Sequence, residues 1–139
     1  MNVGRLASLL LISLSLFACS AKIVNSMAAP DVTLPQIQKE WLLVAIDGQA
    51  IGPELNSTLN VAARATGKLG CNTFFGKLIL KHNTLKIAPL ASTRMICSEI
   101  INDVEMIVAN VLKNSSKMQL IDGELTLSGK IHSLTYRVK

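Results

Sequence analysis

Short apolar stretches that end at turn residues dominate the chain from residue 40 onward. Residues 40–46 are rich in strand-forming side chains, and Leu134, Tyr136 and Val138 alternate with polar residues, which is the pattern of a half-buried strand. A dipeptide such as Asp-Gly between two apolar stretches is a strong hairpin signal. Three dipeptides stand in such positions: Asp47-Gly48, His82-Asn83 and Asp122-Gly123. The pattern therefore predicts antiparallel strands joined in hairpins.

One stretch departs from this β pattern and predicts a helix over residues 99–113. Asn102 with Glu105 three positions later matches a capping box at its start, and Ser98 is the alternative cap one turn earlier. A helix with one apolar stripe must pack on the open face of a sheet, so the expected fold class is α+β. The apolar residues that recur at helical spacing are Ile100, Ile101, Val104, Ile107, Val108, Val111 and Leu112.

The first residues have the pattern of a secretory signal peptide. Residues 6–18 form an apolar run that is too short to cross about 30 Å of hydrocarbon as a helix. The run ends in Leu16-Phe17-Ala18-Cys19, which resembles a bacterial lipobox, so we expect cleavage before Cys19 and lipid attachment to its thiol. A plain signal peptide cut nearby is the alternative. Ser20 follows Cys19, at the position where an Asp would favour retention in the inner membrane. By analogy with Gram-negative lipoproteins, the serine favours the outer membrane.

These patterns divide the chain into a signal peptide at residues 1–18, a lipidated tether at 19–35 and one folded domain at 36–139. The formal net charge is +5, and the basic residues of the domain are scattered singly. Nucleic-acid-binding proteins usually gather theirs into a patch. We therefore expect contact with a membrane through the N-terminal lipid, and no nucleic-acid partner.

Cys71 and Cys97 are the two cysteines within the predicted domain. In an exported protein a disulfide between them is plausible, because the periplasm is oxidising. Two buried free cysteines acting as small apolar side chains are the competing interpretation. A redox-active pair would more often have the close Cys-x-x-Cys spacing, which this chain lacks.

Other catalytic and metal-binding patterns have little support in the sequence. His82 and His132 do not stand at ligand spacing from a cysteine or from each other, so no metal site is expected. The chain has no Gly-x-Ser-x-Gly elbow, and residues 67–70 lack the ending of a phosphate-binding loop. We interpret those residues instead as a strand bend where glycine permits close backbone approach.

Arg94 and Glu105 form the last candidate pair. Arg94 lies beside apolar residues, and Glu105 lies on the helix that follows. Since a buried arginine needs a partner, one hypothesis is that the two side chains pair, directly or through Thr93, and fasten the helix to the sheet. Exposure of both side chains to solvent is the alternative.

Several of these segments together resemble the META/HslJ family of small bacterial heat-shock-associated domains. The Gly-Cys-Asn and Thr-Arg-Met-x-Cys elements are specific when they occur in this order before a helix. The segments that carry the resemblance are Trp41-Leu42-Leu43 with Asp47-Gly48, residues 67–76, residues 90–97, Glu105 and residues 123–127.

The resemblance implies a mostly antiparallel, partly closed β-barrel with one main amphipathic helix packed on it. It implies no established catalytic activity and no cofactor, so no catalytic residues carry over. Phe74 and Phe75 are expected in the core or at the barrel mouth. The signature positions, whose role we expect to be structural, are Gly70, Cys71, Asn72, Gly76, Thr93, Arg94, Cys97 and Glu105.

The functional hypothesis is a non-enzymatic lipoprotein of the cell envelope, anchored in the outer membrane and facing the periplasm. It would act in heat or envelope stress by binding an unknown envelope protein or an apolar ligand. A structural or assembly accessory of the outer membrane with no ligand is the alternative. A thiol-based enzyme that uses Cys71 or Cys97 ranks third.

Overall fold

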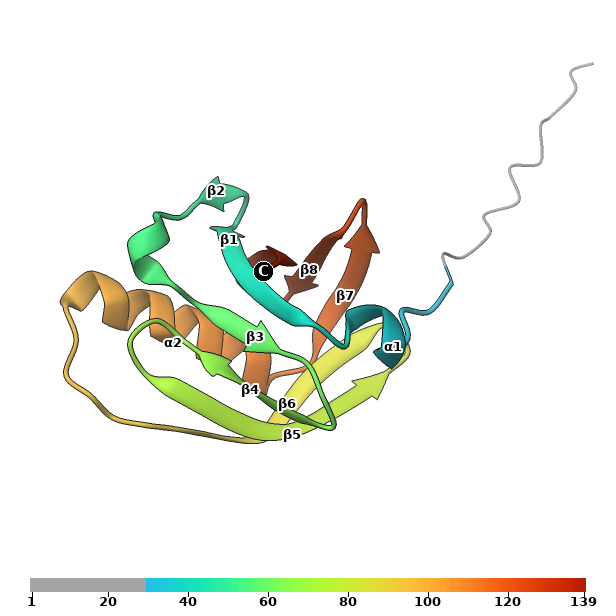
Figure 1. The fold of residues 1–139 in the computed structure, drawn as a ribbon, viewed down its shortest axis with the longest axis horizontal. Helices are drawn as coiled ribbons and strands as arrows, with labels where there is room; N and C mark the ends of the chain where they lie inside the picture. Colours follow the sequence, from blue (N-terminus) through green and yellow to red (C-terminus); the bar gives the residue numbers. More distant parts are fainter. Residues whose placement is uncertain (1–29) are drawn as a thin grey trace, which may run out of the picture.

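The computed structural model describes residues 30–139, so the predicted signal peptide and the predicted lipidation site, Cys19, lie outside the described residues. Within these residues, two α-helices and a short 3-10 helix accompany nine strands (Figure 1). The elements are α1 (Leu34–Ile37), β1 (Glu40–Ile46), β2 (Gln49–Ala50), η1 (Pro53–Leu55), β3 (Thr58–Asn60), β4 (Arg64–Lys68), β5 (Thr73–Lys81), β6 (Thr84–Ser92), α2 (Glu99–Lys113), β7 (Ser116–Ile121), β8 (Glu124–Ser128) and β9 (Ser133–Val138). Within residues 30–139, no helix combines the length and apolarity that crossing a membrane requires.

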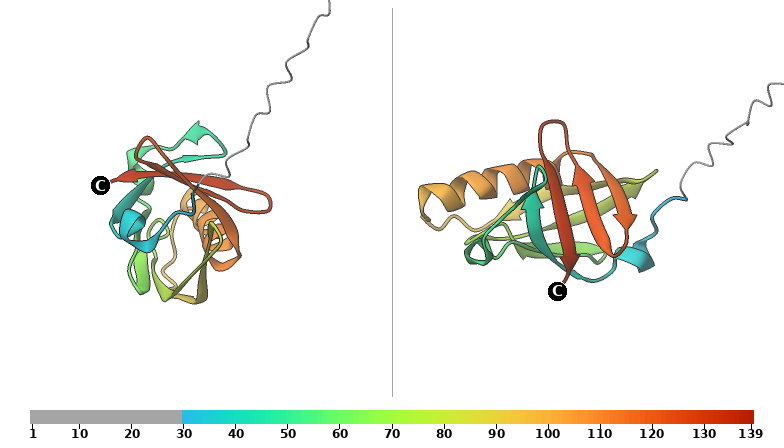
Figure 2. Two further views of the ribbon diagram at one scale, coloured as in Figure 1. Left: turned by 90° about the vertical axis from the view of Figure 1, so that its right-hand side faces the viewer. Right: turned by 90° about the horizontal axis from the view of Figure 1, so that it is seen from above.

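Eight of the strands, β1 and β3 to β9, form a closed antiparallel ring (Figure 2). β1 closes it by pairing with β3 along one side and with β9 along the other, while β2 extends β1 as a short hairpin outside the ring. The predicted α+β barrel with one packed helix is confirmed. Its closure is complete, where the resemblance implied a partly closed barrel.

The predicted helix is confirmed over residues 99–113 as α2. It follows β6, whose pairing with β7 is limited to Thr84 with Lys117 and Leu85 with Ser116. Ser98 is the N-cap residue, so the capping box of Asn102 and Glu105 was wrong. The Asn102 amide instead donates to the Cys97 carbonyl at 3.2 Å, and the Glu105 carboxylate accepts hydrogen bonds from a loop of the barrel.

All three predicted turn dipeptides join consecutive strands: β1 to β2, β5 to β6 and β7 to β8. Both residues of each dipeptide have positive φ, for example 51° at Asp47 and 76° at Gly48. Positive φ at both central residues is the requirement of a type I′ turn, whose twist matches that of the flanking strands. The local sequence signal therefore identified these hairpins correctly.

The barrel is filled by large apolar side chains, with Trp41, Phe74 and Tyr136 the bulkiest. The Trp41 indole donates to the Ile37 carbonyl at 2.8 Å, which anchors α1 at the barrel. Phe75, in contrast, is about half exposed, and the Arg64 guanidinium lies 5.3 Å from its ring centroid.

Part of the segment predicted as a tether packs against the barrel. Val32 and Leu34 pack against the core, and the Val32 N–H donates to the Asn83 side chain. The sequence placed these residues in a linker without periodicity because Val32 bonds to the turn between β5 and β6, 51 residues later in the chain.

Asp47 and His132 join two turns beside the seam between β1 and β9. The His132 Nδ1 lies 2.6 Å from the Asp47 Oδ2, and the Ser133 N–H donates to the Asp47 Oδ1 at 2.7 Å. The hydrogen bond with His132, followed by the one with Ser133, lowers the pKa of Asp47 below its ordinary value. The carboxylate therefore remains charged to a lower pH in the folded protein than in the unfolded chain.

Tyr136 lies fully buried, and its hydroxyl has no hydrogen-bond partner among residues 30–139. Burial raises the pKa of this hydroxyl well above its ordinary value. Because an unsatisfied buried hydroxyl is unfavourable, Tyr136→Phe is expected to raise the free energy of unfolding by about 1 kcal/mol. Urea denaturation would measure this, and a loss of stability of similar size would show that the hydroxyl has a partner.

Candidate functional site

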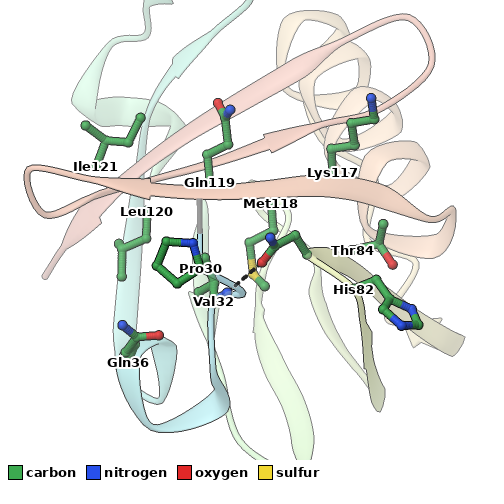
Figure 3. A pocket seen from close by; sticks show the side chains of 11 residues that line it. Pro30, Val32, Gln36, His82, Thr84, Lys117, Met118, Gln119, Leu120 and Ile121 are labelled. Atoms are coloured by element: carbon green, nitrogen blue, oxygen red, sulfur yellow. Dashed lines mark hydrogen bonds between the residues drawn. The ribbon is translucent and has the colours of Figure 1, made fainter. Parts of the chain in front are cut away.

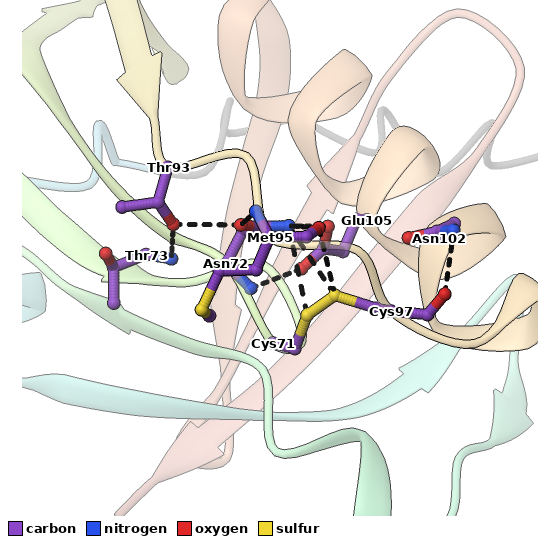
Figure 4. The surroundings of a disulfide bond; sticks show 8 residues. All are labelled: Cys71, Asn72, Thr73, Thr93, Met95, Cys97, Asn102 and Glu105. Atoms are coloured by element: carbon purple, nitrogen blue, oxygen red, sulfur yellow. Dashed lines mark hydrogen bonds between the residues drawn. A yellow bond between two sulfur atoms is a disulfide. The ribbon is translucent and has the colours of Figure 1, made fainter.

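Five signature residues from three separate segments meet at one place, which we call the Asn72 cluster: Cys71, Asn72, Thr93, Cys97 and Glu105 (Figure 4). The first two lie in the loop between β4 and β5. Thr93 and Cys97 lie in residues 93–98, between β6 and α2, and Glu105 lies on α2. The cluster therefore joins two loops of the barrel to the helix.

Asn72 is at the centre of this cluster. Its side-chain amide donates to the Glu105 Oε2 at 2.7 Å and to the Met95 carbonyl at 3.3 Å. Its Oδ1 accepts from the Thr93 hydroxyl at 2.9 Å and from the Met95 N–H at 2.7 Å. The backbone N–H of Asn72 also donates to the Glu105 Oε1. One buried residue is thus hydrogen-bonded both to the loop that precedes α2 and to α2 itself.

Cys71 and Cys97 are joined by a disulfide in the structure, with their Cα atoms 6.6 Å apart. The Asn72 amide nitrogen lies 3.9 Å from the Cys71 Sγ and 3.7 Å from the Cys97 Sγ. Both cysteines are partly exposed. The bond ties the β4–β5 loop to residues 93–98, the same segments that Asn72 connects by hydrogen bonds.

Glu105 contributes a buried carboxylate, only 9% exposed. Both of its oxygens accept hydrogen bonds from Asn72, and no ion pair in residues 30–139 includes it. Gly70 permits this approach of α2, because a Cβ there would lie 3.0 Å from the Ile101 Cγ2 and 3.2 Å from the Glu105 Cγ. A larger residue at position 70 would require the Ile101 and Glu105 side chains to shift slightly.

Besides Gly70, two signature residues lie outside the cluster, Arg94 and Gly76. Arg94 is exposed and forms no ion pair within the described part of the chain, so the direct pairing of Arg94 with Glu105 was wrong. Thr93 does reach Glu105, but through Asn72. Gly76 lies in β5, where a Cβ would collide with the Ile87 side chain.

A second feature is a pocket of about 440 Å³ between residues 30–36 and β7 (Figure 3). Pro30, Val32, Met118, Leu120 and Ile121 supply its apolar surface. The polar residues that line it are Gln36, His82, Asn83, Thr84, Lys117 and Gln119. The pocket therefore combines an apolar wall with a mildly basic, hydrogen-bonding rim.

Sequence reasoning did not find this pocket. It recognised the turn at His82-Asn83, but it placed Pro30 and Val32 in the tether. The usable signal was a pair of apolar residues, Val32 just before α1 and Leu34 at its start, because apolar side chains at this spacing indicate a segment that packs against the domain.

Comparison with known proteins agrees with this geometry. A model of the META domain family matches residues 33–139. The chain is 26% identical over 139 residues to the heat shock protein HslJ of Escherichia coli (strain K12), which covers 96% of this chain and 95% of that relative.

Two NMR structures have a similar fold. One is 26% identical, with a TM-score of 0.68, over 77% of this chain and 95% of its own. The other, from Burkholderia xenovorans, is 22% identical, with a TM-score of 0.61, over 82% of this chain and 93% of its own, and shares the fold. The family match over residues 33–139, together with this common fold, establishes that the chain belongs to the META domain family.

Proposed function

We propose that the chain is a non-enzymatic binding protein of the cell envelope that takes an apolar ligand into the pocket beside β7. Lipidation at Cys19 would anchor it in the outer membrane, with the domain in the periplasm. The name of the Escherichia coli relative refers to heat shock, and we extend a role in heat or envelope stress to this chain. The observation that carries the proposal is the pocket and its lining.

The chemistry of the lining favours an amphiphile. Ligand pockets typically enclose 300–1,000 Å³, with mostly apolar walls and a few placed polar groups. Here Val32, Met118 and Leu120 offer apolar surface, while Lys117 and Gln119 stand at the polar side. An acyl chain would bury its apolar surface against the first group, and an anionic head would lie near the Lys117 ammonium.

The position of the pocket relative to the predicted anchor supports a ligand from the membrane. Pro30 lines the pocket and stands eleven residues after Cys19. Even a fully extended stretch of that length spans at most about 40 Å. A lipidated chain would therefore keep the pocket close to the membrane surface, where acyl chains are concentrated.

Ile121→Asp tests the proposal, with Ile131→Asp as its matched control. Both isoleucines are exposed, 62% and 83%, but only Ile121 lines this pocket. Displacement of a fluorescent fatty acid by dodecanoate would report affinity, and Ile121→Asp is expected to weaken it at least tenfold, or about 1.4 kcal/mol. Ile131→Asp should bind like the unaltered protein.

Native mass spectrometry of the protein purified from membranes provides an independent measurement. A co-purified lipid or fatty acid that is lost in Ile121→Asp supports the pocket. Equal affinity of the two variants would contradict it. If the unaltered protein carries no ligand and binds no dodecanoate, the assembly accessory becomes the better description.

A further inference from the structure

We propose that the Asn72 cluster becomes a metal site when its disulfide is reduced, with Cys71, Cys97 and Glu105 binding one Zn²⁺ ion. The two Sγ atoms and a Glu105 carboxylate oxygen all lie within 4.8 Å of one another. They come from two loops and a helix, and Cys71 lies 26 residues before Cys97 in the sequence. Ligand spacing along the chain could therefore not indicate this site.

The ligand set selects the metal. Two thiolates and a carboxylate suit Zn²⁺, which is bound tetrahedrally by sulfur, nitrogen and oxygen ligands, whereas Mg²⁺ and Ca²⁺ prefer oxygen alone. Three protein ligands leave the fourth position of a tetrahedron to water. Cys71 and Cys97 are partly exposed, so an ion has access to them from solvent.

Glu105 is the second observation that points to a cation. A buried carboxylate is unfavourable unless a counter-charge or strong hydrogen bonds compensate for its lost hydration. Its partners are the backbone and side-chain N–H groups of Asn72, and no cationic side chain in residues 30–139 pairs with it. A Zn²⁺ ion between this carboxylate and the sulfurs would supply the missing positive charge.

Asn72 would orient the ligands from outside the metal's coordination sphere. Its amide donates to the Glu105 Oε2 and lies near both sulfur atoms. Hydrogen bonds of this kind hold a ligand in position and tune its affinity for the metal. The hydrogen bonds from Asn72 leave the remaining lone pairs of the Glu105 carboxylate available to an ion.

The two states exclude each other because the thiolate, not the disulfide, is the metal ligand. A dithiol reductant of the thioredoxin class would transfer two electrons and two protons, which breaks the Cys71–Cys97 bond, yields two thiols and leaves the reductant as a disulfide. Binding of Zn²⁺ would then displace the two thiol protons. Either the covalent bond or the ion would fasten the β4–β5 loop to residues 93–98.

Cobalt titration tests the site, with Co²⁺ as a spectroscopic probe for Zn²⁺. Reduced protein, freed of reductant without oxygen, is expected to develop a thiolate-to-cobalt charge-transfer band that saturates at one ion per chain and disappears when Zn²⁺ is added. The oxidised protein should show no band. Glu105→Gln is expected to weaken Co²⁺ binding at least tenfold, and the exposed Glu99→Gln on the same helix should leave it unchanged.

Cys97→Ser removes one thiolate ligand and leaves the buried carboxylate in place. The charge-transfer band of this variant should no longer saturate at one Co²⁺ ion per chain. Circular dichroism of each reduced protein, before and after Co²⁺, would report folding; recovery of the fold on adding the ion also supports the site. The proposal is overturned if the reduced protein gives no thiolate-to-cobalt band. It is equally overturned if Cys97→Ser or a folded Glu105→Gln binds Co²⁺ as tightly as the unaltered chain.

Discussion

Asn72→Ala is expected to lower the free energy of unfolding by about 3–4 kcal/mol. The substitution removes two hydrogen bonds donated to Glu105 and Met95, and two accepted from Thr93 and Met95. A single hydrogen bond contributes about 1 kcal/mol net, but a buried charge that loses a partner costs more. The Glu105 carboxylate would retain only the backbone N–H of residue 72.

Asn102→Ala is the matched control for this prediction. Asn102 is exposed on α2, and its side chain makes one hydrogen bond, to the Cys97 carbonyl. We expect its replacement to change stability by less than about 1 kcal/mol. Urea denaturation of both oxidised variants would give the difference, and a similar effect of the two substitutions would show that Asn72 is not the centre of the cluster.

The features that the sequence predicted well are those that depend on neighbours along the chain. The Asp47-Gly48 and Asp122-Gly123 turns follow from the φ angles that their residues tolerate, and α2 follows from the spacing of its own apolar residues. Strand ends that depend on distant contacts have no such local signal. In the structure β3 ends at Asn60, and the Val61 N–H donates to the Lys39 carbonyl, so the strand is interrupted by a distant contact.

The candidate sites show the limit of that reasoning more clearly. Asn72 and Glu105 are 33 residues apart in the sequence, and the pocket places Pro30 beside β7. Neither site has a recognisable spacing of residues along the chain. Each is formed by loops and strands that meet only in the closed barrel. Family resemblance identified the cluster residues, but the predicted direct pairing of Arg94 with Glu105 was wrong, since the Glu105 carboxylate accepts its hydrogen bonds from Asn72.

Gly67→Ala is the second substitution with a large expected effect, a loss of about 3 kcal/mol in the free energy of unfolding. Gly67 lies in β4, opposite Leu59 of β3 and Phe74 of β5. A Cβ at this position would collide with the Thr58 carbonyl oxygen and lie 3.0 Å from the Phe74 ring. Since the first obstacle is backbone and the second is a buried core residue, no side-chain rotation can relieve the overlap, and β3 must move away from β4.

That movement would also stretch two hydrogen bonds that join the same strands, from the Ser57 hydroxyl to the Lys68 carbonyl at 2.9 Å and from the Lys68 N–H to the Thr58 hydroxyl at 3.2 Å. Thr66→Ala, exposed on the same strand, is the control and should change stability by no more than about 0.5 kcal/mol. Urea denaturation distinguishes the two. Equal stability of the two variants would mean that β3 and β4 can separate freely, and that Gly67 does not determine how closely these strands approach.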